Sequence, residues 1–264
     1  MSVFLKKTVL FDFLVKMGQT MTDSISDDLL ANKTILITGA GDGIGKALAI
    51  QCATLGAEVI LLGRTVKKLE VVYDQIASLN KQSAAILPVD LNGATEEHYR
   101  DLASTVLREY GKLDGLVHNA SQLGVLSPFT QIESKMWDEV LQTNVTSAFL
   151  MTKYLIPVLE KAPHASTIFT SSGVGNKGRA YWGPYSISKF ATEGMMQVLA
   201  DEYENSTLRF NVVNPGATKT AMRASAFPAE DTEQLKTPEQ ILTTYLHLLS
   251  DESISVTGTR DNAQ

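Results

Sequence analysis

Short apolar segments rich in β-branched residues alternate with segments of helical periodicity from Asn32 almost to the end of the chain. A short apolar run predicts a buried strand, whereas apolar residues three or four positions apart predict a helix. Because parallel strands need a crossover between them, such alternation favours a parallel sheet covered by helices. The sequence therefore predicts a doubly wound α/β fold of about seven strands, with helices on both faces.

The expected elements follow one another without a linker rich in proline, glycine or serine, so residues 31–264 are predicted to form a single domain. Strands are expected at 33–38, 58–62, 85–89, 113–118, 167–171 and 208–214, with a short last strand at 255–259. Helices are expected at 44–55, 66–79, 96–110, 135–161, 185–203 and 237–249.

Residues 1–30 precede the first strand, and three lysines and an aspartate interrupt the apolar residues among the first 16. The uncharged runs are too short for a signal peptide or for a membrane span of about 20 residues. We interpret residues 1–30 as a leader outside the fold. The alternative is an amphipathic helix over residues 3–17 that lies on a membrane or a partner. Both interpretations predict a cytoplasmic protein.

The charge and the metal-binding residue types exclude several classes of protein. Lys and Arg number 23 against 29 Asp and Glu, a net charge of −6, and no basic block is present. Nucleic-acid binding depends on neutralising phosphates, so it is not expected. A single cysteine excludes an internal disulfide, and the four histidines do not recur at ligand spacing, so no metal site is predicted.

A glycine-rich turn, TGAGDGIG over residues 38–45, joins the first expected strand to the first expected helix. At this place free backbone N–H groups and the positive end of the helix dipole point at a ligand, and glycines let a pyrophosphate approach the backbone. Neither the phosphate-loop pattern GxxxxGK[ST] nor GxGxxG can be placed on the turn. The pattern TGxxxGxG, with Gly39, Gly43 and Gly45, predicts a Rossmann-type dinucleotide site rather than a plain turn.

The second expected strand ends in LLGRT, residues 61–65, without the acid that would bind the ribose 2′-hydroxyl of NAD. Arg64 instead offers a fork of donors suited to a 2′-phosphate. One charged hydrogen bond of about 1.5–3 kcal/mol favours NADP(H) over NAD(H) by roughly ten- to a hundredfold. The acid Asp42 in the glycine turn weakens the prediction of NADP(H). The alternative is that Arg64 is only a solvated side chain at the start of a helix.

Tyr185 and Lys189 are four residues apart, so a helix places both side chains on one face. A phenol has a pKa of about 10, too high for proton transfer near neutral pH. A cation about 5 Å away, at an effective dielectric constant of about 20, would lower that pKa by roughly two units. The pair is therefore a candidate for general acid–base catalysis.

Two further polar residues occur at positions where a function is a reasonable hypothesis. Ser172 ends the fifth expected strand, at the sheet edge where open α/β folds bind ligands, and could hydrogen-bond a substrate carbonyl. Ser171 is the alternative if that strand ends one residue earlier. Asn144 lies inside the long expected helix, where asparagine is unfavourable and caps nothing.

The motifs follow one another in a defined order: TGxxxGxG, Asn119-Ala120, Asn144, Ser172, Tyr185-xxx-Lys189 and Pro215-Gly216. With them the chain resembles the short-chain dehydrogenase/reductase family over residues 31–259. Residues 169–227 resemble the YciK-type group of bacterial oxidoreductases. One departure is His118-Asn119-Ala120-Ser121 in place of Asn-Asn-Ala-Gly, and His118 is interpreted as a packed or capping side chain.

The resemblance implies a catalytic tetrad in which Tyr185 transfers the proton and Ser172 polarises the carbonyl. Lys189 would bind the nicotinamide ribose and lower the Tyr185 pKa, and Asn144 would hold a water in a proton relay. The cofactor-binding residues that it implies are Gly39, Asp42, Gly43, Ile44, Gly45, Arg64, Asp90, Leu91, Asn119, Ala120, Tyr185, Lys189, Pro215, Gly216, Thr218 and Thr220.

The resemblance further implies an NADP(H)-dependent carbonyl reductase or alcohol dehydrogenase for a small-molecule substrate, assembled as a homodimer or homotetramer. A cofactor-binding sensor or scaffold with little turnover is the alternative function. Substrate contacts are expected near the strand ends and in the irregular stretch 217–236, with surface packing as the alternative for each. These candidates are Leu123, Tyr181, Trp182, Met222 and Phe227.

Overall fold

The computed structural model describes residues 28–79 and 84–264. These residues form a seven-stranded sheet in the order β3-β2-β1-β4-β5-β6-β7, and every neighbouring pair is parallel. The strands are β1 (Thr34–Thr38), β2 (Glu58–Gly63), β3 (Ala84–Pro88), β4 (Gly115–His118), β5 (Ala165–Thr170), β6 (Leu208–Asn214) and β7 (Arg260–Asn262). The predicted doubly wound fold is confirmed. The strand order reverses between β1 and β4, where such sheets bind their ligands.

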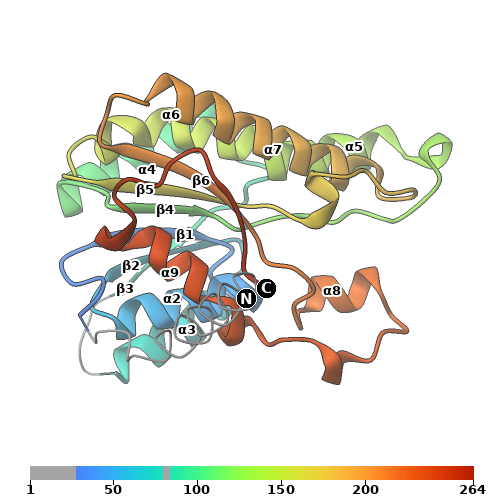
Figure 1. Cartoon of the computed structure of the whole chain (residues 1–264), viewed down its shortest axis with the longest axis horizontal. Coiled ribbons are helices and arrows are strands. Elements are labelled where there is room, and N and C mark those ends of the chain that lie inside the picture. Colours follow the sequence, from blue (N-terminus) through green and yellow to red (C-terminus); the bar gives the residue numbers. More distant parts are fainter. Residues whose placement is uncertain (1–27, 80–83) are drawn as a thin grey trace, which may run out of the picture.

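Helices cover both faces of the sheet (Figure 1). One face carries α2 (Gly43–Thr54), α3 (Val66–Ala77) and α9 (Thr243–Leu249). The other carries α4 (Glu96–Tyr110), α6 (Ser147–Leu159) and α7 (Gly183–Glu202). Two further helices are α5 (Ser134–Leu141), which leads toward α6, and the short α8 (Ala221–Ala226).

The central strand β1 shows why the sheet forms here. All five of its residues, TILIT, are buried, because helices cover both of its faces. A strand in this position reads as a continuous run of β-branched and aliphatic residues rather than as an alternating one. Small residues of α2, including Ala49 and Ala53, are fully buried and let that helix approach the sheet closely.

The folded domain includes Leu30, one residue before the predicted boundary. Its side chain is fully buried, and its N–H donates a hydrogen bond to the Leu55 carbonyl at 2.9 Å. Residues 1–27 of the predicted leader lie outside the described residues, as does the alternative amphipathic helix at 3–17.

Three expected elements differ from the structure. The long helix expected at 135–161 is interrupted by a π-helical turn, Gln142–Thr146, between α5 and α6. The helix expected at 237–249 begins as a 3₁₀ turn, Pro238–Ile241, before α9. The strand expected at 255–259 is wrong. Gly258 has a φ of +73°, which breaks the extended backbone there, and β7 begins only at Arg260.

Within residues 28–79 and 84–264, no helix combines the length and the apolar character needed to cross a membrane. The same residues contain no cluster of three or more histidine, cysteine, aspartate or glutamate side chains that could bind a metal ion.

Candidate active site

A cavity of about 740 Å³ lies along the carboxyl edge of the sheet, lined by segments that follow β1, β2, β3, β4, β5 and β6. It brings together all but two of the predicted catalytic and cofactor-binding residues, Gly45 and Asn144 being the exceptions. The predicted residues that line it are Gly39, Asp42, Gly43, Ile44, Arg64, Asp90, Leu91, Asn119, Ala120, Ser172, Tyr185, Lys189, Pro215, Gly216, Thr218 and Thr220.

The glycine turn depends on the absence of side chains. Gly39 and Gly43 have φ angles of +68° and +50°, a region that favours glycine. A Cβ on Gly45 would overlap the Gly39 carbonyl oxygen and the Asn119 side-chain amide. Gly45 therefore acts by allowing α2 to pack against the turn, which explains why it does not line the cavity.

The order of the segments that line the cavity fits a dinucleotide. The segment after β2 contributes Arg64, the turn after β1 lies next to it, and the segment after β5 contributes Ser172. A ligand along this edge would meet a basic side chain, then the N-terminus of α2, and then the predicted catalytic residues. An adenosine phosphate, a pyrophosphate and a nicotinamide would encounter these surfaces in that order.

Tyr185 and Lys189 both lie on α7 and line the cavity. They are 7% and 4% exposed. The Lys189 Nζ donates a hydrogen bond to the Thr170 carbonyl at 2.8 Å and lies 5.5 Å from the centre of the Tyr185 ring. The amine therefore faces both the phenol and the open cleft, as their spacing on a helix predicts.

The pKa values of this pair differ from the expectation. Burial raises the pKa of Tyr185 to about 12, although a hydrogen bond with the Ser172 hydroxyl opposes the rise. Burial lowers the pKa of Lys189 to about 8, opposed by the nearby Glu193 charge. In the chain alone, the pKa of Tyr185 is therefore raised rather than lowered toward neutrality as predicted, because desolvation of the phenolate is the largest influence on it.

Ser172, not its neighbour Ser171, offers its hydroxyl to Tyr185. The Ser171 Oγ donates a buried hydrogen bond of 2.5 Å to Glu193 Oε1, because β5 ends at Thr170 and the next side chain turns inward. The Ser172 Oγ accepts a hydrogen bond from the Val174 N–H at 3.4 Å.

Glu193 and Arg260, which the sequence analysis missed, hold the segment that carries Ser172. The Arg260 Nε donates to both Glu193 carboxylate oxygens, at 3.0 and 3.1 Å, and the Arg260 guanidinium also donates to the Ser172 carbonyl at 3.3 Å. Glu193 is buried one helical turn beyond Lys189. The spacing of Glu193 from Lys189 was the only sequence feature that could have pointed to Glu193. No feature of the sequence indicated that Arg260 of β7 would bind it.

Asn144 lies in the π-helical turn and binds the chain segment after β4. Its Oδ1 accepts a hydrogen bond from the Gln122 N–H at 2.7 Å, and its Nδ2 donates to the Gln122 carbonyl and to the Ser188 Oγ at 3.0 and 2.9 Å. A second cavity of about 10 Å³ is lined by Asn144, Lys189 and Thr192, among others. This volume is close to the room that one water molecule needs.

His118, which replaces an asparagine of the family pattern, is a packed side chain. Its ring stacks on Phe169 at 4.8 Å between centres, and its Nε2 lies 2.9 Å from the Thr152 hydroxyl. Burial, with a smaller effect of the Lys189 charge, lowers the pKa of His118 to about 3.

At the other end of the cavity, Arg64 is exposed and makes no hydrogen bond or ion pair with any part of the chain that the structure describes. Asp42 forms an ion pair of 2.5 Å with Lys68, a lining residue that the sequence analysis missed. The acid in the glycine turn, which counted against NADP, is therefore matched by a cation. The sequence feature that could have indicated Lys68 is its position four residues after Arg64, about one helical turn.

Three of the five candidate substrate contacts line the cavity: Leu123, Trp182 and Met222. Tyr181 is 62% exposed and lies outside it. Phe227 also lies outside the lining and packs on Trp182, with ring centres 5.6 Å apart. The alternative of surface packing therefore describes Tyr181 and Phe227.

A profile of the short chain dehydrogenase family matches residues 33–231. The chain belongs to the short-chain dehydrogenase/reductase family of oxidoreductases. It is 48% identical over 237 residues to the uncharacterised oxidoreductase YciK of Escherichia coli K12, which covers 90% of this chain and 94% of that protein. The resemblance to the YciK-type group is thus confirmed.

Two solved structures from this group contain a nucleotide. A short-chain dehydrogenase from Shigella flexneri 2a, crystallised with NADP, has a TM-score of 0.89 and 48% identity, covering 90% of this chain and 100% of that one. Another from Escherichia coli CFT073, crystallised with NADPH, has a TM-score of 0.88 and 48% identity, covering 91% and 100%.

Proposed function

We propose that the protein is an NADP(H)-dependent carbonyl reductase or alcohol dehydrogenase that acts on a small molecule. The observation that carries the proposal is the buried Lys189 amine beside the Tyr185 phenol, within the same cavity as the glycine turn and Arg64. The NADP and NADPH in the two similar crystal structures support the choice of cofactor.

The residues that would hold the cofactor follow from the lining of the cavity. The N–H groups at the start of α2 would bind the pyrophosphate, Arg64 the adenosine 2′-phosphate, and Asp90 and Leu91 the adenine side. Asn119 would lie near the adenosine-side ribose, Lys189 would bind the nicotinamide ribose, and the segment 215–220 would border the carboxamide. The bound cofactor supplies or accepts the hydride.

The chain's own residues would handle the proton. In the reducing direction the Tyr185 hydroxyl donates its proton to the carbonyl oxygen as that oxygen gains negative charge, while the Ser172 hydroxyl donates a hydrogen bond to the same oxygen. Burial raises the pKa of Tyr185 to about 12, so the phenol holds its proton at neutral pH, and the hydrogen bond with the Ser172 hydroxyl, which opposes the rise, would ease the release of that proton. Lys189, with a pKa of about 8, and a water in the cavity beside Asn144 would return the proton from solvent.

The direct test is Tyr185→Phe. Loss of the proton donor is expected to lower NADPH oxidation on a panel of aldehydes and ketones by at least about a hundredfold. NADPH affinity, measured by titration, should change little and shows that the variant is folded. An intact variant with wild-type turnover would refute the role of Tyr185. A wild-type protein that binds NADPH tightly and turns over no carbonyl compound would favour the sensor or scaffold.

The cytoplasmic location and the assembly into a homodimer or homotetramer stay predictions. A sedimentation velocity measurement on the full chain would determine the oligomeric state. Vesicle flotation of the full chain would test the alternative of a membrane-surface helix at 3–17, because binding to lipid is expected only from that alternative.

A further inference from the structure

A lysine of α3 lies over the glycine turn at the adenosine end of the cavity. Lys68 is in the first turn of α3, and its Cβ lies 2.9 Å from the position that a Cβ on Gly41 would occupy. The Lys68 Nζ is 2.5 Å from the Asp42 Oδ2. The helix thus delivers an ammonium group to the turn itself.

The two oxygens of Asp42 have different partners. The Oδ1 accepts a hydrogen bond from the Gly43 N–H at 2.8 Å and caps α2, and only the Oδ2 contacts Lys68. Lys68, the largest influence, holds the pKa of Asp42 below its ordinary value, so the carboxylate is charged at neutral pH. Asp42 therefore cancels the charge of Lys68.

The side chains of Lys68 and Asp42 are 55% and 58% exposed, and both line the cavity together with Arg64. An ion pair with this exposure contributes little to stability, so a stronger anion can replace the carboxylate at little cost. Asp90, the other acid in this part of the lining, accepts a hydrogen bond from the Asn92 N–H at 3.2 Å.

We propose that Lys68 is a second ligand of the cofactor's 2′-phosphate, next to Arg64, and that Asp42 competes with the phosphate for its ammonium group. This inference rests on the proposed NADP(H) dependence and adds the residues that set how strongly NADP(H) is preferred. A phosphate monoester carries about −1.5 to −2 charges at neutral pH, more than one carboxylate, and would therefore displace Asp42.

The competition has a direct consequence for cofactor preference. To bind the Lys68 ammonium group, the 2′-phosphate of NADPH must break the ion pair of Lys68 with Asp42. NADH has no 2′-phosphate and leaves that ion pair intact. Asp42 therefore reduces the preference for NADPH without affecting NADH. Removing the acid should increase the preference, and removing the lysine should decrease it.

The test measures the dissociation constants of NADPH and NADH by nicotinamide fluorescence for the full chain and its variants. In Lys68→Met, NADPH should bind about three- to tenfold more weakly and NADH within about twofold of wild type. In Asp42→Asn, which keeps a side chain suited to capping α2, NADPH should bind about two- to fivefold more tightly. The double variant should lose that gain, because the two side chains act through one contact.

Lys67→Met is the matched control, since Lys67 is the exposed neighbour on α3 and does not line the cavity. It should leave both dissociation constants unchanged. Adenosine 2′,5′-bisphosphate and adenosine 5′-monophosphate, used as competitors, should repeat the contrast, because they differ only in the 2′-phosphate.

Equal weakening of NADPH and NADH in Lys68→Met would overturn the assignment of Lys68. An unchanged NADPH to NADH ratio in Asp42→Asn would overturn the competition. Both outcomes differ from failure of the proposed function, in which the wild-type protein itself would either not bind NADPH or bind it and turn over no carbonyl compound.

Discussion

His118 and Lys189 are buried bases on neighbouring elements, and the surroundings of both disfavour the charged form. Each is removed from water, and the Lys189 charge lowers the pKa of His118 further. An imidazole in this position can serve as a packing group beside Phe169 only while it stays neutral. Its burial therefore makes stability depend on pH below neutrality.

The first prediction concerns His118→Asn. The pKa of His118 lies at about 3 in the folded chain and near 6.5 when unfolded, so the unfolded chain takes up the extra proton as the pH falls. Between pH 7 and pH 4.5 the wild type should lose about 2–3 kcal/mol that the variant does not lose. Urea denaturation across this range measures the difference. The two stability curves should run parallel above about pH 7.5, and parallel curves throughout would contradict the prediction.

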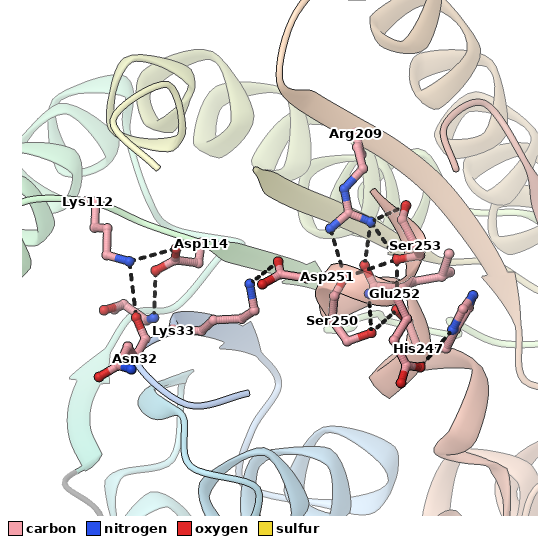
Figure 2. Close-up of polar contacts among 12 residues, drawn as sticks. Asn32, Lys33, Lys112, Asp114, Arg209, His247, Ser250, Asp251, Glu252 and Ser253 are labelled. Atoms are coloured by element: carbon pink, nitrogen blue, oxygen red, sulfur yellow. Dashed lines mark hydrogen bonds and ion pairs between the residues drawn. The ribbon is translucent and has the colours of Figure 1, made fainter. Parts of the chain in front are cut away.

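At the scale of elements, the buried Arg209 hydrogen-bonds the C-terminal end of α9 and the turn after it. Figure 2 shows Arg209 of β6 reaching the turn that follows α9. Its guanidinium donates to the carbonyls of Leu248, Ser250 and Ser253 at 3.0, 3.3 and 2.8 Å. The Ser250 and Ser253 carbonyls also accept hydrogen bonds from the Ser253 Oγ and the Val256 N–H, at 3.2 and 2.9 Å. The Leu248 carbonyl lies in the last turn of α9, where no helical N–H follows, so Arg209 satisfies an acceptor at the end of the helix.

The second prediction follows from this contact. Arg209→Met fills a similar space but removes the donor to the Leu248 carbonyl and one of the donors to the Ser250 and Ser253 carbonyls, and should destabilise the protein by about 2–4 kcal/mol. The midpoint of urea denaturation measures the loss. Arg108→Met, at a side chain 66% exposed on α4, is the control and should change stability by less than about 0.5 kcal/mol. A loss at position 209 as small as the control's would show that water replaces the guanidinium.

The elements that the sequence could predict are those whose signal is local. Buried strands such as β1 and amphipathic helices such as α4 carry their own periodicity, and their predicted bounds agree with the structure within two residues. The π-helical turn depends instead on Asn144 binding the backbone at Gln122, a contact between distant segments. The hydrophobic periodicity of one segment cannot predict a contact with a segment distant in the sequence.

Within the site, too, residues in local motifs could be predicted, whereas residues brought together from distant segments could not. The glycine turn, Ser172 and the Tyr185–Lys189 pair were predictable because each motif has a local chemical reason. Glu193 and Arg260 were not, since β7 brings them together across the fold. The high pKa of Tyr185 also needed the structure, because it depends on how completely the packed chain removes the phenol from water.

At the scale of the whole molecule, the cavity joins segments from nearly every strand of the sheet. The helices that border it belong to two separate apolar cores, one on each face. A ligand that fills the cavity would contact both halves of the sheet at once. Ligand binding should therefore stabilise the domain as a unit rather than one loop.

The third prediction is a cofactor-dependent shift of thermal unfolding. NADPH at a hundredfold excess over its dissociation constant should stabilise the protein by about 2.7 kcal/mol and raise the midpoint by about 5–10 °C. NADH at the same concentration should give about half that shift if it binds tenfold more weakly. Differential scanning fluorimetry measures both, and equal shifts from the two nucleotides would contradict the assignment of Arg64.

The guanidinium that holds the Ser172 carbonyl lies on β7, at the edge of the sheet, and comes later in the sequence than every other strand described here. During synthesis the glycine turn, Arg64 and the Tyr185 helix all leave the ribosome before Arg260 does. A nascent chain could therefore complete its nucleotide-binding surface while the serine still lacks this support. The order of translation itself would separate the acquisition of binding from the acquisition of full turnover.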